Sequence, residues 1–369
     1  MTKKLTIGFV RRGFSASGGA EAYLKRLAAG LEGNGHAVRL YASMNWPPEE
    51  WTFGPLTRID ARSAIGFADE IEKLATSSEC NVLMSFERIW RCDLYRAGDG
   101  VHRSWLERRE KSSGSFQKLR RVFNRKHSAT LALEESLFAK GGAARVIANS
   151  RMVKDEIVHF YGFPAEKIDV VYNGVPIDAL QPDAETRARL RKTLGLGERD
   201  VAVLFAGSGW ERKGLRFAID AIEKTGKEMR LLVAGRGEER KFRSERVQFL
   251  GVVEDMPALY AAADIFLAPT IYDPFSNACL EALAAGLPVI TTHANGFSEI
   301  IETGVHGTIV NDPRETGEIR EALVFWSDSS RREDARAGIR ELAARFDISA
   351  NVARTLEILA QFAARAAST

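Results

Sequence analysis

Two series of short apolar segments, each alternating with stretches of helical periodicity, constrain the fold of this chain more than any other feature. The first series lies at residues 5–10, 37–41, 82–86, 145–148 and 168–171. The second lies at residues 201–206, 229–234, 248–252, 265–268, 289–292 and 308–310. Alternating strands and helices predict parallel sheets, because a parallel connection needs a crossover that is usually a helix. The fold class is therefore α/β, with two doubly wound, Rossmann-like domains.

The two series are separated by a turn-rich segment in which Asn173-Gly174-Val175-Pro176 interrupts the strand pattern. A chain of 369 residues is long for one hydrophobic core and ordinary for two domains. We therefore predict a first domain at 1–172, a linker at 173–178, a second domain at 179–348 and a C-terminal helical segment at 349–369.

Cysteine usage and hydropathy predict a cytoplasmic protein. Cys80, Cys92 and Cys279 lack paired metal spacing, which favours reduced thiols. No apolar run approaches the roughly 20 residues that span a bilayer. The apolar part of the N-terminal segment is too short for a signal peptide and continues into a strand pattern.

The segment from Ala268 to Pro288 combines a strand end, a short loop and a helix. Ser276 is a suitable N-cap for that helix, with Asp273 just before it and Glu281 inside it. A helix N-terminus attracts anions through free backbone N–H groups and its positive dipole end. Acids on either side of such a site can hold hydroxyl groups, which matches the shape of a sugar nucleotide. The alternative is an ordinary capped helix with a solvated Glu281.

Two glycine-containing loops each follow the first strand of a series. Gly18-Gly19 can bring backbone N–H groups close to a phosphate, although a simple tight turn also explains it. This loop lacks the Gly-x-Gly-x-x-Gly pattern, which argues against a nicotinamide or flavin dinucleotide. In the second loop, Arg212 and Lys213 can neutralise a pyrophosphate at the carboxyl end of a strand. The alternative for this pair is a solvated surface charge.

Together these motifs resemble the family-4 retaining glycosyltransferases, which have the GT-B fold. The resemblance rests on Asp273-x7-Glu281, Arg212-Lys213-Gly214 and Gly18-Gly19-Ala20-Glu21, and it covers most of the chain. It is closest to the lipopolysaccharide-core glucosyltransferase I type. It implies two domains facing a cleft, with the helix of 349–369 crossing back onto the N-terminal, acceptor-side domain.

The resemblance also implies roles for individual residues on the donor side. Arg212 and Lys213 would contact the donor diphosphate, and Asp273 would hold hydroxyls of the transferred sugar. Glu281 would bind the ribose. The backbone of Phe275, Ser276 and Asn277 would cap the phosphates, and Gly18 and Gly19 would face the donor. The family normally has Glu where this chain has Asp273, which is one methylene shorter.

The implied activity is a retaining transfer of a hexose, glucose from UDP-glucose, to a hydroxyl of a membrane-associated acceptor such as the lipopolysaccharide inner core. Attack on the same face as the leaving phosphate would retain the anomeric configuration. The chain contains no Asp-x-Asp and no His-Glu-x-x-His motif, so no metal cofactor is expected. Arg212, Lys213 and the helix at Ser276 would stabilise the leaving group instead.

On the acceptor side, the stretch from Asp93 to His102 resembles a segment that supplies acids near the acceptor in the lipopolysaccharide-core glucosyltransferases. Asp99 is the candidate for positioning or polarising the acceptor hydroxyl, and His102 is a second candidate. Because Asp99 lies between two glycines, a plain turn residue is an equal alternative.

Residues 103–127 contain nine Lys and Arg but two Asp and Glu, in a chain whose formal net charge is +3. Large apolar residues are interleaved with these charges, which favours docking on an anionic membrane surface or a phosphorylated acceptor. A solvated loop is the alternative. Nucleic acid is not expected as a partner, because no recognition module accompanies the segment. We expect a monomer at the inner face of the inner membrane.

Three other functions stay open. A UDP-sugar epimerase of the same fold would interconvert UDP-sugars without an acceptor. A family-4 transferase could use a different nucleotide sugar. A binding module would retain Arg212, Lys213 and Glu281 but show no turnover.

Overall fold

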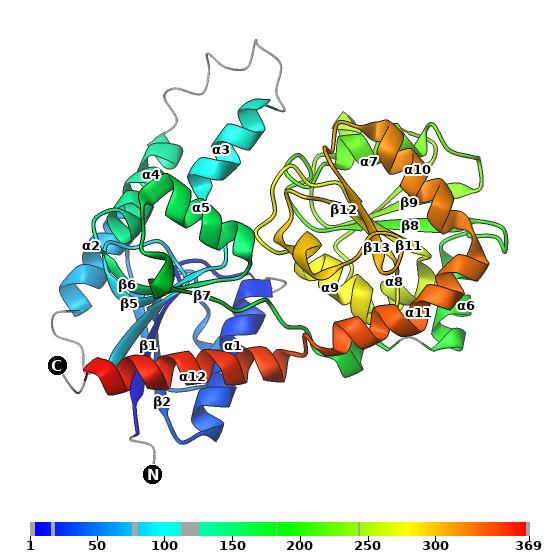
Figure 1. Ribbon diagram of the computed structural model, residues 1–369. Helices are drawn as coiled ribbons and strands as arrows, with labels where there is room; N and C mark the ends of the chain where they lie inside the picture. The colour runs from blue at the N-terminus through cyan, green and yellow to red at the C-terminus, as the bar shows by residue number, and fades with distance from the viewer. Residues whose placement is uncertain are drawn as a thin grey trace. The chain divides into compact units, whose positions relative to one another are not determined.

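The computed structural model describes residues 4–15, 19–75, 80–111, 125–181, 183–242 and 244–366. It divides into two compact units, 1–172 together with 349–369, and 173–348 (Figure 1). Each unit is built on one parallel sheet. Within the described ranges, no helix combines the length and the apolar character needed to cross a membrane.

The first unit contains a seven-stranded sheet with the order β3-β2-β1-β4-β5-β6-β7, in which all neighbours are parallel. Its strands are β1 Thr6–Val10, β2 Ala37–Ser43, β3 Leu56–Ile59, β4 Val82–Ser85, β5 Cys92–Ala97, β6 Ala143–Ala148 and β7 Ile168–Val170. The strand order reverses between β1 and β4, and ligands of such sheets bind outside the carboxyl ends of the strands at this point.

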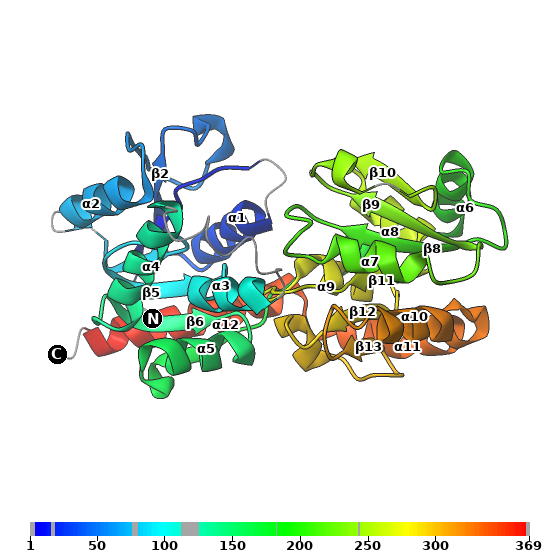
Figure 2. The same cartoon turned by 90° about the horizontal axis from the view of Figure 1, so that it is seen from above.

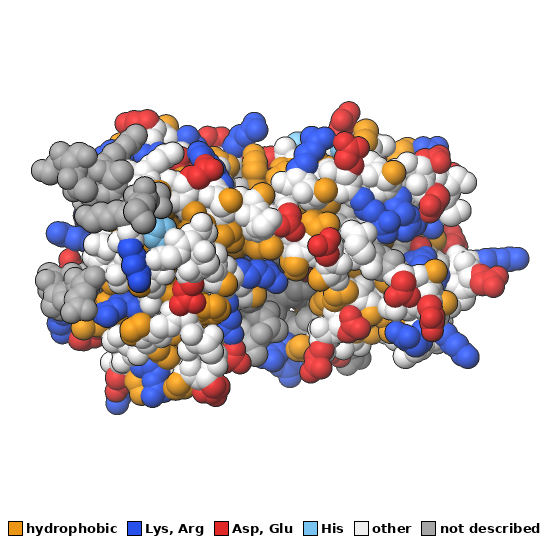
Figure 3. Space-filling model, turned by 90° about the horizontal axis from the view of Figure 1, so that it is seen from below, with side chains coloured by type: hydrophobic (Ala, Val, Ile, Leu, Met, Phe, Trp, Pro, Cys, Tyr) orange, Lys and Arg blue, Asp and Glu red, His pale blue; other side chains and the backbone are white. Residues whose placement is uncertain are grey.

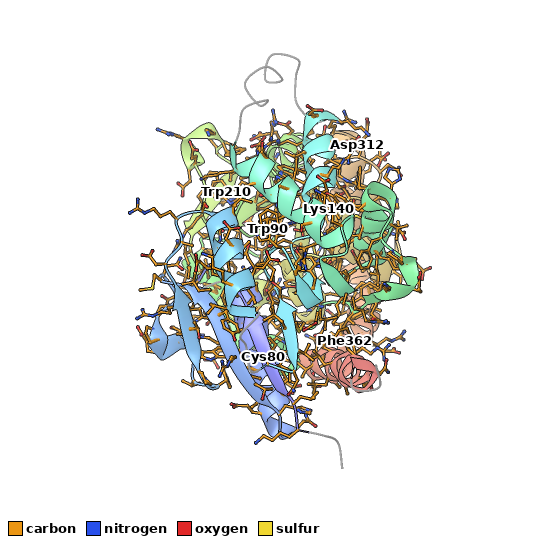
Figure 4. The ribbon with its side chains drawn as sticks, turned by 90° about the vertical axis from the view of Figure 1, so that its left-hand side faces the viewer. Cys80, Trp90, Lys140, Trp210, Asp312 and Phe362 are labelled. Atoms are coloured by element: carbon orange, nitrogen blue, oxygen red, sulfur yellow. The ribbon has the colours of Figure 1, made fainter. Side chains whose placement is uncertain are left out.

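Helices cover both faces of this sheet, which is why β1 and β4 at its centre are mostly apolar. The helices of the unit are α1 Gly19–Gly33, α2 Ala64–Ala75, α3 His102–Lys111, α4 Arg125–Phe138, α5 Arg151–Tyr161 and α12 Ile348–Ala366, with short 3-10 turns η1 Pro48–Glu50 and η3 Ala165–Lys167. Ile7 and Phe9 on β1 are completely buried, as is Met84 on β4. Cys80 lies next to the same strands (Figure 4), against the backbone of Gly8.

Helix α12 packs on the first unit, beside α1 (Figure 1). The hydroxyl groups of Tyr23 on α1 and Thr355 on α12 lie 3.3 Å apart. Asn351 donates from Nδ2 to the carbonyl of Tyr172. A Cβ on Gly30 would lie 2.4 Å from a Val352 methyl, so the two helices touch closely.

The second unit contains a six-stranded parallel sheet with the order β10-β9-β8-β11-β12-β13, which Figure 2 shows from one edge to the other. Its strands are β8 Val201–Ala206, β9 Met229–Ala234, β10 Val247–Gly251, β11 Ile265–Ala268, β12 Val289–Thr292 and β13 Gly307–Val310. The order reverses between β8 and β11, so the carboxyl ends of these two strands mark the expected ligand position.

The helices of the second unit are α6 Ala184–Thr193, α7 Leu215–Ile222, α8 Met256–Ala262, α9 Asn277–Ala284, α10 Thr316–Ser327 and α11 Ser329–Ala344, with 3-10 turns η4 Ile177–Leu180, η5 Glu239–Lys241 and η6 Gly296–Ile300. Residues 173–178, the predicted linker, lie in this unit, where Val175 forms a β-bridge with Asp347. Acidic and basic side chains are interspersed on the part of each unit that Figure 3 shows.

Candidate active site

The loop from Gly207 to Gly214 connects β8 to α7, and its glycines adopt backbone conformations with positive φ that other residues rarely adopt. Gly214 has a φ of +78°, and a Cβ there would lie 1.9 Å from the carbonyl oxygen of Pro269. Only glycine allows this approach to the end of β11. Trp210 (Figure 4) closes the loop by donating its indole N–H to the carbonyl of Gly207 at 3.0 Å.

The loop places Arg212 and Lys213 against the segment that follows β11. The carbonyl of Arg212 accepts hydrogen bonds from the Ile271 N–H at 2.9 Å and the Thr270 hydroxyl at 3.0 Å. Its Nη1 donates to the carbonyl of Tyr272 at 2.8 Å. Both ends of Arg212 are therefore held, and the guanidinium has little freedom to turn away.

Arg212, Lys213 and Asp273 converge on one point. Oδ2 of Asp273 lies 3.6 Å from Arg212 Nη1 and 3.5 Å from Lys213 Nζ. The Lys213 and Asp273 side chains are only 13% and 9% exposed, so these charges interact more strongly than surface pairs do. Two cations face one carboxylate, which leaves a net positive charge at the carboxyl ends of β8 and β11.

Asn295, which sequence reasoning did not identify, connects this point to the start of α9. It is completely buried, and its Oδ1 accepts hydrogen bonds from the N–H groups of Ser276 at 3.2 Å and Phe297 at 3.1 Å. The backbone of Asp273 is bonded to both neighbours of Asn295. Its N–H donates to the carbonyl of Ala294, and its carbonyl accepts from the N–H of Gly296. The only sequence signal was an Asn before a glycine, which is typical of a turn.

Helix α9 begins as predicted, with Ser276 as its N-cap. The Ser276 hydroxyl accepts a hydrogen bond from the N–H of Cys279 at 3.4 Å. A helix leaves its first N–H groups without intrahelical acceptors, so those of Asn277 and Ala278 are available to an anion. The N–H of Ser276, one of the three predicted phosphate caps, is already bonded to Asn295. Asn277 accepts at Oδ1 from Asn173 Nδ2 at 2.7 Å.

Glu281 lies in the second turn of α9, where Tyr260 of α8 holds its carboxylate. The Tyr260 hydroxyl donates to Glu281 Oε2 at 2.8 Å. Burial raises the pKa of Tyr260 well above its ordinary value, and the Glu281 charge raises it further. The phenol therefore stays protonated and keeps donating. Sequence reasoning missed Tyr260, because a tyrosine in an apolar helix does not reveal its partner.

The predicted role of Glu281 as a ribose ligand can be tested through its partner, with the substitution Tyr260→Phe. The substitution keeps the buried ring and removes one hydrogen bond to a carboxylate, so we expect a loss of about 1.5–3 kcal/mol in the free energy of unfolding. We also expect a higher KM for the sugar-nucleotide donor, because the carboxylate loses its orientation. Tyr23→Phe, which removes the contact to Thr355 in the first unit, is the matched control. Equal donor KM values in the two variants would contradict this role.

The acceptor-side candidates lie in the first unit. Asp99 follows β5, its side chain is 55% exposed, and its Oδ2 lies 3.8 Å from Arg11 Nη1 and 3.9 Å from Arg88 Nη1. His102 is the first residue of α3, and its Nε2 lies 3.0 Å from Nδ1 of His127. Asp99 and His102 thus have different partners. Gly19 is the first residue of α1, whereas Gly18 lies outside the described residues.

A buried carboxylate, Glu134 of α4, organises the start of α3. Its oxygens accept from the backbone N–H groups of His102 at 2.6 Å and Arg103 at 3.3 Å. They also accept from Arg88 Nε at 2.9 Å and from the Tyr161 hydroxyl at 2.8 Å. Glu134 is completely buried. Its contacts come from α3, from α5 and from the segment that follows β4, so no local sequence motif indicated them.

His102 should make the first unit less stable as the pH falls. Burial lowers the pKa of His102 from 6.5 to about 4, and the nearby Arg88, His127 and Arg109 add to the shift. Between these two values the unfolded chain binds more protons than the folded protein, so the free energy of unfolding rises with pH in this window. His102→Gln should flatten that part of the profile, measured by denaturant titration from pH 4 to pH 7. A His102 ring that titrates near pH 6.5 by NMR would contradict the prediction.

Two protein-family models match the chain. Residues 200–326 match the model described as glycosyl transferases group 1, and residues 99–179 match glycosyltransferase family 4. A probable transglycosylase of Burkholderia thailandensis is 30% identical over 305 residues, 80% of this chain and 80% of that protein. The lipopolysaccharide glucosyltransferase WaaG of Escherichia coli is 24% identical over 327 residues, 83% and 85% of the two chains. Matches to two further glycosyltransferases span only 46% and 59% of those relatives.

Solved structures agree with these matches. The crystal structure of WaaG, a glycosyltransferase involved in lipopolysaccharide biosynthesis, superposes with a TM-score of 0.80 at 21% identity, over 95% of this chain and 99% of that chain. HepE of Anabaena, in complex with UDP and glucose, gives a TM-score of 0.75 at 19% identity over 97% and 100%. The predicted GT-B fold of two Rossmann-like domains is confirmed, and the chain belongs to the group 1, family 4 glycosyltransferases.

Proposed function

We propose that this protein is a retaining, metal-independent hexosyltransferase that moves glucose from UDP-glucose to a hydroxyl of a lipopolysaccharide-core or other membrane-associated glycan. The observation that carries the proposal is the convergence of Arg212, Lys213 and Asp273 beside the start of α9. These groups supply what a sugar diphosphate needs, namely two cations, helix N–H donors and a carboxylate for hydroxyl groups.

The negative charge of a diphosphate complements the net positive charge of Arg212, Lys213 and Asp273. Arg212 can bind two phosphate oxygens through its planar guanidinium, and Lys213 acts as a point charge. Both cations lie more than 3.4 Å from the Asp273 carboxylate, so neither is held there by a short hydrogen bond. On donor binding, phosphate oxygens can approach Lys213 Nζ and the guanidinium nitrogens of Arg212 that Tyr272 does not hold, while Asp273 accepts from hydroxyls of the transferred sugar. The N–H groups of Asn277 and Ala278 then cap the phosphate at the helix N-terminus.

Glu281 is proposed to bind the ribose. Its carboxylate is oriented by the Tyr260 hydroxyl and lies on the same helix whose N-terminus caps the phosphate. A ribose is the part of a nucleotide that follows the diphosphate, so a carboxylate further along α9 can accept hydrogen bonds from its hydroxyls.

In the transfer step, the acceptor oxygen forms a bond to the anomeric carbon while the bond from that carbon to the phosphate oxygen breaks. Negative charge accumulates on the leaving phosphate, where Arg212, Lys213 and the start of α9 stabilise it. The acceptor proton passes to a phosphate oxygen. Because the nucleophile approaches on the face that the phosphate leaves, the product keeps the anomeric configuration of the donor.

The choice of sugar and acceptor is supported by the relatives. WaaG is named a lipopolysaccharide glucosyltransferase, and HepE was solved with UDP and glucose. A lipid-linked acceptor would place the enzyme at the inner face of the inner membrane as a peripheral protein, and we propose that it acts there as a monomer. Residues 103–127 are the proposed membrane contact; α3 covers their beginning, and 112–124 lie outside the described residues.

The test is donor turnover by wild-type protein and Glu281→Ala, with UDP-, GDP- and ADP-sugars, with and without EDTA. We expect slow release of UDP from UDP-glucose, insensitive to EDTA, and lost in Glu281→Ala. Glu321→Ala, an exposed acid on α10, is the control and should behave as wild type. Loss of turnover in EDTA would overturn metal independence, and a product of inverted configuration would overturn retention.

The same assay separates the alternatives. Conversion of one UDP-sugar into another without an acceptor would identify an epimerase. Binding of UDP without turnover, even after truncated lipopolysaccharide is added, would identify a binding module. Turnover restricted to a GDP- or ADP-sugar would keep the transferase and change the donor.

A further inference from the structure

We propose that Arg11 is a positioning residue for the acceptor. It connects Glu21 of helix α1 to two carboxylates, Glu87 and Asp99, and holds them as a pair that accepts hydrogen bonds from acceptor hydroxyls. The inference rests on the proposed transferase function and names the residues of the first unit that would serve it.

The topology of the first sheet brings these residues together at the carboxyl ends of its strands. Arg11 directly follows β1, Glu87 comes two residues after β4, and Asp99 comes two residues after β5. These three strands are neighbours in the order β1-β4-β5, and all of them are parallel. Their carboxyl ends therefore meet at the point where the strand order reverses, which is where open α/β sheets bind ligands.

One edge of the Arg11 guanidinium is occupied by Glu21. Nε and Nη2 of Arg11 lie 3.2 and 3.1 Å from the same oxygen, Glu21 Oε1. The side chains of Arg11 and Glu21 are only 16% and 6% exposed. A planar guanidinium that is held at two nitrogens by a buried carboxylate has a defined direction for its third nitrogen.

That third nitrogen faces the proposed pair. Nη1 of Arg11 lies 3.8 Å from Asp99 Oδ2 and 4.0 Å from Glu87 Oε2, and it donates to the carbonyl of Phe86 at 3.4 Å. The two carboxylate distances are too long for hydrogen bonds. The cation thus keeps the two acids near each other through charge, without using their lone pairs.

Asp99 is the more accessible member of the pair. Its side chain is 55% exposed, whereas that of Glu87 is 18% exposed. Arg88 approaches Asp99 from the other side, at 3.9 Å, and is itself anchored on buried Glu134. Asp99 therefore lies between two arginines that are each fixed by another acid, while its oxygens remain open to a hydroxyl donor.

The charge of the group favours hydroxyls over phosphate. It contains four carboxylates, Glu21, Glu87, Asp99 and Glu134, against three guanidiniums, those of Arg11 and Arg88 and that of Arg12, whose charge also acts on Glu87. Burial raises the pKa of the Glu87 carboxyl; Arg11 opposes this effect and Asp99 adds to it. An excess of acids repels a phosphate group. The part of the acceptor that binds beside Glu87 and Asp99 should therefore carry free hydroxyls.

The test compares Arg11→Gln and Arg11→Lys with wild type, in acceptor titrations at saturating donor and in UDP-binding titrations. We expect Arg11→Gln to raise the acceptor KM and lower kcat by about tenfold or more, with UDP affinity unchanged. Arg11→Lys keeps the charge and should recover part of kcat. Arg145→Gln, which breaks the 2.6 Å pair with Asp169 between β6 and β7 of the same sheet, is the control for a purely structural loss.

Asp99→Asn keeps the test decisive if Arg11→Gln does not fold. This exposed substitution should lower kcat, and its effect should be non-additive with that of Arg11→Lys, because both act on the same carboxylate. Wild-type acceptor KM and kcat in Arg11→Gln, or additive effects in the double variant, would overturn the proposal. If wild type transfers no sugar at all, the proposed function fails and this inference fails with it. If wild type transfers sugar and the Arg11 and Asp99 variants have the same kcat and acceptor KM as wild type, this inference alone fails.

Discussion

Lys213→Ala is expected to lower donor turnover by about 100-fold to 1,000-fold, and Arg212→Ala by a similar factor, because each removes one preorganised group that stabilises the leaving phosphate. Both side chains are held at the carboxyl ends of β8 and β11, within 3.6 Å of Asp273. In the partly buried site a cation acts on the developing charge more strongly than it would in water. The measurement is kcat for UDP release from UDP-glucose with acceptor present.

The matched control for this prediction is Arg216→Ala. Arg216 is an exposed cation in the first turn of α7, only three residues beyond Lys213, and it has the same charge. If Arg216→Ala slows turnover as much as Lys213→Ala does, general surface charge and not the geometry at Asp273 controls the reaction.

Glu134→Gln is expected to destabilise the first unit by about 3–5 kcal/mol, because it leaves the guanidinium of Arg88 buried without its carboxylate. The Arg88 side chain is 10% exposed and that of Glu134 is fully buried. The substitution also weakens the acceptors for the His102 N–H and the Tyr161 hydroxyl. The measurement is the free energy of unfolding from a denaturant titration, with amide hydrogen exchange to assign the loss to the first unit.

The neighbouring residue provides the control. Glu135 is next in the chain, and its side chain is 56% exposed in a pair with Lys140. Glu135→Gln should change the free energy of unfolding by less than about 1 kcal/mol, as exposed ion pairs do. A similar small effect for Glu134→Gln would show that water or another group replaces the lost carboxylate.

The alternation of strands and helices predicted the α/β fold well, and each of the six segments of the second series corresponds to a strand of the second sheet. Two strands of the first sheet were missed. Edge strand β3 is Leu-Thr-Arg-Ile, which has too few apolar residues for a buried run. In strand β5, Asp93 and Arg96 interrupt the apolar run that would have indicated a buried strand. Its charges are satisfied across elements: Asp93 accepts from the N–H of Leu83, and Arg96 stacks on Tyr23.

The candidate site was predictable where its residues form local motifs. Arg212, Lys213 and Asp273 were identified because glycines, a strand end and a helix cap surround them in the sequence, and the structure brings the three together. Tyr260 and Asn295 could not be found in this way. Each of them contacts the site from another element, so its partner depends on tertiary packing and not on spacing.

The most direct test of the donor site is a calorimetric comparison of UDP and UMP binding to wild type and to the Arg212→Ala/Lys213→Ala double variant. The two ligands share base and ribose and differ by one phosphate, which is the group that the two cations and the start of α9 would hold. We predict that wild type binds UDP at least about tenfold more tightly than UMP, roughly 1.4 kcal/mol, and that the double variant does not distinguish them. Equal affinities in wild type, or a preference for UDP that survives in the double variant, would contradict the account.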